Sequence, residues 1–195
     1  MNILIDILKV IHILSAVLMA WPYYALVAVN QRARLGPPLG DRTDIYIENI
    51  IKNRTIPCYI FQASVFISGL ALVFLGGGRI DTLITNPLLG IKFVLLLAIA
   101  GILTSVHTGL QPRLDSLFDK AGKPPFPEEI AKEIGQLRST RKRRASICLF
   151  CVLVMAMLGV QVWSPFPVWL NGVLVLAIAA FTMRASNSET PYGWA

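Results

Sequence analysis

The chain has 195 residues, of which 55% are hydrophobic and 15% are charged, and its mean hydropathy is +0.62. A soluble domain carries about 25% charged residues, and here the apolar residues fall into long runs, so we expect an integral membrane protein. The net charge of +7 then indicates basic loops on one side of the membrane, and we expect no nucleic-acid partner.

Five apolar stretches each come close to the roughly 20 residues that a helix needs to cross the hydrocarbon core. In chain order they are Ile7–Val29, Ile56–Leu75, Leu88–Leu110, Ser146–Trp163 and Pro167–Met183. The last two are separated only by "SPFP", whose prolines end one helix and favour a tight hairpin. We therefore expect an all-α, polytopic bundle of five transmembrane helices that forms one domain over residues 1–195.

Basic residues are concentrated in alternate loops, which predicts the orientation. The loop after the first span holds Arg32, Arg34, Arg42, Lys52 and Arg54, and the loop after the third span, residues 111–145, holds nine more. The loop between the second and third spans has only Arg79, and the "SPFP" turn has none. We predict an outside N-terminus, a cytoplasmic C-terminus and a multi-pass location in the inner (plasma) membrane.

The loop 111–145 has features of a structured cytosolic segment. We expect it to contain a helix of its own, with Pro127 in the first turn and Glu128–Glu129 near the positive end of the helix dipole. The basic run from Arg138 to Arg144 is then expected at the lipid headgroups. A dedicated site for an anionic lipid or a partner is the alternative interpretation of this run.

Ionisable side chains inside a membrane are costly, and each is a candidate for function. They are Lys9 and His12 in the first span and Lys92 and His107 in the third. At 1.5 Å per residue, His12 and Lys92 lie ~9 Å and ~10 Å to the outer side of the membrane centre, and His107 lies ~12 Å to the inner side. His12 and His107 are therefore predicted to be ~21 Å apart along the membrane normal, too far to ligate one haem iron.

Helical spacing predicts one shared face of the first span that forms a pocket wall, made of Lys9, His12, Ser15, Ala16, Met19 and Tyr23. Simpler interpretations stay open, because both lysines can extend to the membrane surface and His12 can make an interhelical hydrogen bond. We expect an interfacial role for His107.

Other polar groups in the spans have structural interpretations. Cys148 and Cys151 are expected on one face of the fourth span. A single CxxC lacks the second pair of ligands for zinc or an iron–sulfur cluster. Gln62 is expected to be buried and to hydrogen-bond across helices.

Three segments together resemble a known family. "LKVIHILSAVLMAW" (Leu8–Trp21) resembles the first span of the HemJ-type protoporphyrinogen oxidases and of their copper-resistance-D-like relatives, which contains K-x-x-H. "NRTIPCYIFQASVFISGLALV" (Asn53–Val73) and "LLGIKFVLLLAIAG" (Leu88–Gly101) resemble the second and third spans. In those enzymes a histidine usually stands two residues before the third-span lysine, where this chain has Gly90.

This resemblance implies a membrane protein that binds haem b and, for the oxidases, the six-electron oxidation of protoporphyrinogen IX to protoporphyrin IX. His12 would be the ligand of the haem iron, and Lys92 a second ligand or the partner of a haem propionate. A respiratory electron acceptor, partner membrane subunits, membrane lipid and self-association are the expected interactions. The alternative functions are a non-catalytic haem-binding or structural subunit of an electron-transfer complex, and a metal-ion transporter.

Overall fold

The computed structural model describes residues 3–35, 40–53, 55–162 and 164–187. Helices account for 86% of these residues, and no strand occurs among them. In chain order the elements are α1 (Ile3–Leu18), α2 (Trp21–Leu35), α3 (Arg42–Lys52), α4 (Thr55–Leu75), α5 (Thr82–Thr85), α6 (Pro87–Ser105), η1 (Val106–Leu110), α7 (Gln111–Ala121), α8 (Glu128–Val160) and α9 (Val168–Asn187).

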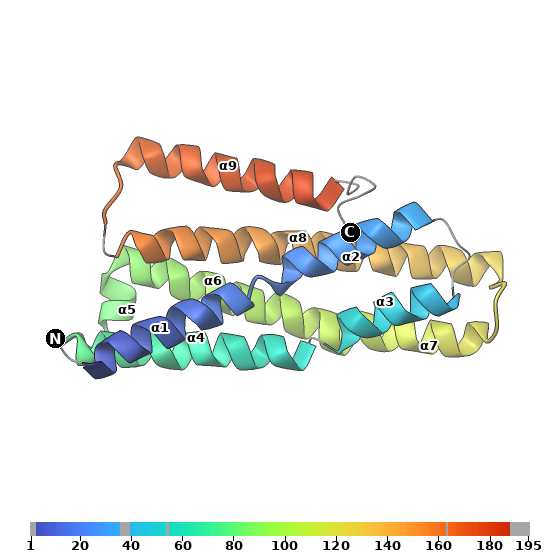
Figure 1. Cartoon of the computed structure of the whole chain (residues 1–195), viewed down its shortest axis with the longest axis horizontal. Coiled ribbons are helices and arrows are strands. Elements are labelled where there is room, and N and C mark those ends of the chain that lie inside the picture. The colour runs from blue at the N-terminus through green and yellow to red at the C-terminus, as the bar shows by residue number, and fades with distance from the viewer. Residues whose placement is uncertain (1–2, 36–39, 54, 163, 188–195) are drawn as a thin grey trace.

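Five helical segments in the described part of the chain are long and apolar enough to span a membrane. They confirm the expected all-helical, five-span class, and each runs opposite to the one before it (Figure 1). The hairpin at "SPFP" is also confirmed, because α8 ends at Val160, α9 begins at Val168, and the two helices pack together. Arg54 and the side chain of Arg34 lie outside the described residues.

The first span is broken, whereas we expected one continuous helix from Ile7 to Val29. α1 ends at Leu18 and α2 begins at Trp21. Pro22 explains the break, because it has no N–H to donate to Leu18 and its ring clashes with a helical carbonyl four residues earlier. The break redirects the chain: α1 packs on α4, whereas α2 packs on α8, α9 and α3.

The segment 111–145 is not a loop with a separate helix, as the sequence suggested. α6, η1 and α7 form a continuous helical run of 35 residues from Pro87 to Ala121. α8 begins at Glu128 and continues without interruption through the fourth span to Val160. The polar parts of these runs extend the bundle at one end, because nothing between Arg138 and Ser146 stops a helix.

The transmembrane part of the bundle has its core between α1, α4, α6 and α8. Val65, Ile99 and Met155 are buried there from α4, α6 and α8, together with Met19 just after α1 and the partly buried Ala16 of α1. Many large apolar side chains on the outer faces, such as Leu176 of α9, are exposed, and in a bilayer these faces contact lipid. α9 lies at the edge of the bundle (Figure 1).

The polar end of the bundle, as we call α3, α7 and residues 128–145 of α8, has a small core of its own. Leu114, Leu117 and Ile134 are buried between α7 and α8, with Phe118 and Phe126 packed against them. Figure 1 shows α3 and α7 beside the start of α8 at this end.

A buried carboxylate connects α3 to α2 and α8 at the polar end. Asp44 is 1% exposed and accepts hydrogen bonds from Arg32 Nε (2.7 Å), Arg138 Nη1 (2.9 Å) and the Gly40 N–H (3.0 Å). Burial disfavours the charged form of Asp44, but these donors outweigh that effect and hold its pKa below the ordinary value.

Glu48, one helical turn further along α3, forms the second half of this network. Its carboxylate accepts hydrogen bonds from both terminal nitrogens of Arg141, from Arg138 Nη2 (3.1 Å) and from Gln111 Nε2 (3.3 Å). Burial again opposes ionisation, yet the Arg141 and Arg138 guanidinium groups keep the pKa of Glu48 below its ordinary value. The Asp44–Glu48 network therefore joins α3 to α7 and α8 through charges that are largely shielded from water.

The basic run from Arg138 to Arg144 is thus divided between two environments, and its expected level at the lipid headgroups stays a prediction. Arg138 and Arg141 turn inward to Asp44 and Glu48, and Arg141 is 6% exposed. Arg143 is exposed, whereas Lys142 and Arg144 are half-buried. Sequence pattern alone does not reveal this, because the carboxylates are about 90 residues away.

Candidate functional site

The inward face of α1, together with Met19 directly after its end, contains three of the predicted site residues. His12 is half-buried, Ser15 is 8% exposed and Met19 is 3% exposed, whereas the intervening Leu14 is 56% exposed. The spacing of three and four residues explains this, because it returns to the same side of a helix. The predicted shared face is confirmed for these three residues, but not for Tyr23, which lies in α2 beyond the break and is 38% exposed.

His12 is held by a hydrogen-bond chain that begins on α4. Ser68 Oγ lies 2.5 Å from the Ser64 carbonyl and 3.3 Å from the Val65 carbonyl, both of the α4 backbone. His12 Nδ1 lies 2.9 Å from Ser68 Oγ, and the tautomer of the ring sets which of the two atoms donates. In the tautomer with the proton on Nδ1, Nε2 keeps the lone pair that can bind a metal ion or accept a proton.

Gly69 allows the imidazole to approach α4 closely. A Cβ atom at Gly69 would lie 3.2 Å from His12 Cε1 and 3.7 Å from His12 Nδ1. The Nδ1–Cε1 edge of the ring therefore rests on the α4 backbone, and Nε2 lies beyond this contact.

We expect Gly69→Val to weaken the packing of α1 on α4 by about 1–3 kcal/mol, the usual cost of overpacking a filled interface. The added methyl groups would push the His12 ring away from Ser68. Thermal unfolding of the purified protein in detergent, followed by circular dichroism, measures the loss.

Gly101→Val on α6 is the matched control for this substitution, because a Cβ at Gly101 meets nothing within 4 Å. It makes the same change of residue type in another apolar helix. Equal destabilisation by the two variants would contradict the contact between Gly69 and His12.

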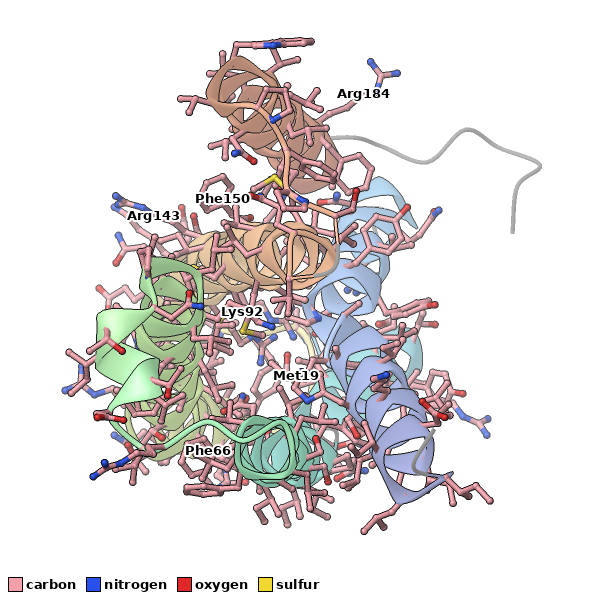
Figure 2. The ribbon with its side chains drawn as sticks, turned by 90° about the vertical axis from the view of Figure 1, so that its left-hand side faces the viewer. Met19, Phe66, Lys92, Arg143, Phe150 and Arg184 are labelled. Atoms are coloured by element: carbon pink, nitrogen blue, oxygen red, sulfur yellow. The ribbon has the colours of Figure 1, made fainter. Side chains whose placement is uncertain are left out.

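Lys92 projects from α6 toward the interior of the bundle. In the end-on view of Figure 2, Lys92 and Met19 both lie between the ribbons of α1, α4, α6 and α8. The ammonium nitrogen is 3.7 Å from the position that a Cβ would take at Gly159 of α8. Among the described residues Lys92 has no ion-pair partner, and it is half-buried, as His12 is. The structure therefore places both of these predicted site residues on inward-facing helix surfaces of the bundle.

Lys9 and Met19 have other neighbours. Lys9 pairs with Asp6 of its own helix at 3.3 Å, with both side chains 41% exposed, and so lies toward the end of α1. Met19 packs in the core against Val65 and Met155. Of the predicted set, Ser15 lies one turn from His12 on α1, and the grouping of His12 with Lys92 stays a prediction.

His107 lies at a different level of the bundle. It is exposed within the π-helical turn η1, and its ring meets Tyr59 edge to face at 6.2 Å. Tyr59 and Ser68, the α4 contacts of the two histidines, are nine residues apart, which corresponds to about 14 Å along a helix. This distance is shorter than the ~21 Å expected from the spans, yet it still excludes a shared iron, whose two ligand nitrogens would be about 4 Å apart.

Gly90 occupies the position where the resembled family has a histidine, and a side chain there would require the neighbouring α5 backbone to shift. A Cβ at Gly90 would lie 3.1 Å from the backbone carbonyl of Leu83, because α5 folds against the start of α6. The contact is with backbone, so a larger residue here would require α5 to move.

Two further predictions concern buried polar groups and cysteines. Gln62 is buried as expected, but its Oε1 has no hydrogen-bond partner among the described residues, so the predicted interhelical bond is not formed by this atom. Cys148 and Cys151 are buried free thiols packed in the core. The described residues contain no group of three or more His, Cys, Asp or Glu side chains placed to hold a metal ion.

Ser68 and Gly69 were not identified from the sequence. In an apolar span a serine and a glycine are common small residues at helix contacts, so neither indicates a histidine partner. The serine hydroxyl becomes informative only once α1 is placed against α4.

No family model matches this chain, and no curated protein or solved structure matches it significantly.

Proposed function

We propose that this chain is a haem b-binding membrane oxidoreductase, with His12 as a ligand of the haem iron and Lys92 as the second polar contact of the site. The observation that carries the proposal is the chain from His12 Nδ1 through Ser68 to the Ser64 carbonyl. Histidines that ligate metals typically donate their other ring N–H to a carboxylate, a backbone carbonyl or a water molecule, which fixes the tautomer and the orientation of the ring, and the Ser68 hydroxyl would take that place here.

The residues of the site fit haem b by their chemistry. His12 offers an imidazole with a free Nε2, in the outer half of an apolar bundle. Lys92 offers an ammonium group without a carboxylate partner among the described residues, which suits a haem propionate or a second axial position. Haem b, when bound, supplies a one-electron redox centre whose potential depends on these contacts.

The proposed reaction is oxidation of protoporphyrinogen IX to protoporphyrin IX, with the electrons passed to a respiratory acceptor. Its support is the joint resemblance of the first three spans, with K-x-x-H at Lys9–His12 and the lysine at Lys92. The role of this chain's residues would be to hold His12 neutral and oriented and to place one positive charge beside the substrate or cofactor carboxylates. We further propose that the N-terminus lies outside and the C-terminus lies inside a bacterial plasma membrane.

One observation favours a second candidate, a non-catalytic haem-binding subunit of a larger electron-transfer complex. The approach of the Leu83 carbonyl to Gly90 leaves no room for the histidine that the resembled oxidases have at this position. A chain that keeps the His12 site and lacks that residue is suited to carry electrons without binding the porphyrinogen.

The absorption spectrum of the purified protein tests the proposal. We expect a Soret band in the wild type and its loss in His12→Ala, because removal of the imidazole leaves no other histidine at that level of the bundle. Lys92→Ala is expected to retain the band with a shifted position or a changed midpoint potential. His107→Ala is the control and should retain the wild-type spectrum.

Absence of a Soret band from wild-type protein produced with haem supplied would refute the haem site. Loss of the Soret band in His107→Ala, with the band retained in His12→Ala, would show that His107 is the ligand and would contradict the assignment of His12. If the band depends on His12, turnover of protoporphyrinogen IX by the isolated protein separates the oxidase from the subunit, because only the oxidase consumes the substrate without partner proteins.

A further inference from the structure

A pocket lies where the broken first span leaves α4. Because Pro22 redirects α2 toward α8, α9 and α3, the second half of the first span does not follow α4 as α1 does. The pocket occupies the resulting space and is lined by α2, the start of α4, α6 and α8. Its volume is about 100 Å³.

The walls of the pocket are apolar. Pro22, Ala25 and Val29 line it from α2, and Ile102 and Leu103 line it from α6. Cavities of roughly 150 Å³ with such walls accept a benzene ring, so this one has room for a short segment of hydrocarbon chain.

Basic side chains line the pocket toward the polar end of the bundle. They are Arg141, Lys142 and Arg144, and no aspartate or glutamate is among the residues that line it. Arg141 is neutralised by Glu48. Lys142 has no ion-pair partner among the described residues, and Arg144 donates to the hydroxyl of Ser105 at 2.9 Å rather than to a carboxylate. The pocket therefore combines an apolar interior with two positive charges that no carboxylate of the described residues balances.

We propose that this pocket binds an anionic phospholipid, with its phosphate at Lys142 and Arg144 and a segment of one acyl chain between α2 and α6. The charges are complementary, and each cation near an anionic lipid contributes about 1 kcal/mol of attraction. The position also fits, since α8 changes from basic to apolar between Arg144 and Cys148, where a bilayer changes from headgroups to hydrocarbon. A soluble anion would gain nothing from the apolar walls.

Native mass spectrometry of the purified full chain tests this site with two lipids of the same acyl chains, phosphatidylglycerol and phosphatidylcholine. We expect tighter binding of phosphatidylglycerol. Lys142→Ala combined with Arg144→Ala should weaken its binding about 25-fold, which is about fivefold for each cation removed. Ala25→Phe should weaken the binding of both lipids, because the new ring fills the cavity while both charges remain.

Arg143→Ala is the matched control, because Arg143 lies between the two cations in sequence but is exposed and does not line the pocket. Figure 2 shows its side chain on the outside of the bundle. An equal loss of binding in this variant would overturn the proposal, as would equal binding of the two lipids by the wild type. Displacement of phosphatidylglycerol by millimolar inorganic phosphate would also overturn it, since the site would then belong to a free anion. Unchanged circular dichroism of each variant shows that a loss of binding is not a loss of fold.

Discussion

Replacing Glu48 with glutamine is expected to lower the free energy of unfolding of the polar end by about 3–5 kcal/mol. The substitution keeps the size of the side chain and removes its charge. Arg141, which is 6% exposed, would then remain buried opposite a neutral amide, and the amide nitrogen cannot accept the hydrogen bonds that the carboxylate accepts. Breaking a buried ion pair at one partner is costly because it leaves an uncompensated charge away from water.

Limited proteolysis measures this effect locally. Opening of α3 unfolds the backbone around Lys52 and uncovers Arg138 and Arg141 of α8 to trypsin, so Glu48→Gln should be cleaved in this region much faster than the wild type. Glu133→Gln is the matched control, since Glu133 lies on α8 in the same end of the bundle, is exposed and forms no ion pair with a described residue. Equal cleavage rates for the wild type and Glu48→Gln would show that the network does not hold α3 in place.

Acidification is expected to release the same end of the bundle. Asp44 and Glu48 both have pKa values below their ordinary values of 3.8 and 4.5. A carboxylate whose pKa is lowered by folding binds more protons when unfolded, so stability rises with pH across the interval between the two pKa values. The contribution of the network is therefore complete above the ordinary values and is lost as the pH falls through them toward the lower, folded values.

The pH dependence of thermal unfolding between about pH 7 and pH 3 checks the sign of this prediction. The wild type should keep a constant melting temperature down to about pH 5 and lose stability below it. In the double variant Asp44→Asn, Glu48→Gln the slope in the acidic range should be smaller, because the two groups that take up protons are gone. If the melting temperature of the double variant falls with pH as steeply as that of the wild type, other carboxylates cause the acid sensitivity.

Some properties of this protein follow from the sequence alone. Long runs of apolar residues determine the membrane-length helices, because every backbone group inside a bilayer must be paired within its own segment. The hairpin between α8 and α9 also follows from local chemistry, since the two prolines of "SPFP" end a helix wherever it packs. The face shared by His12, Ser15 and Met19 follows from the helical repeat and requires no knowledge of the partner helix.

Pro22 is also a local feature of the sequence, yet the break that it makes between α1 and α2 was not predicted. A proline in an apolar run is compatible with both a kinked and a continuous span, and the neighbouring helices decide between them. The continuity of α8 was missed for the opposite reason. Its change from polar to apolar residues suggested that one helix ends and another begins there. A helix can continue across such a change, because its backbone hydrogen bonds do not depend on the polarity of the side chains.

The tertiary structure alone decided which polar residues meet. His12 acquires its hydrogen-bond partner only because α4 brings Ser68 to its Nδ1, and Lys92 meets Gly159 only because α8 packs on α6. Similarly, Arg138 and Arg141 look like headgroup-binding residues until α3 supplies Asp44 and Glu48 from far away in the sequence. Helix formation depends on the character of each segment, whereas the pairing of buried charges depends on which helices are neighbours, and that information is not local.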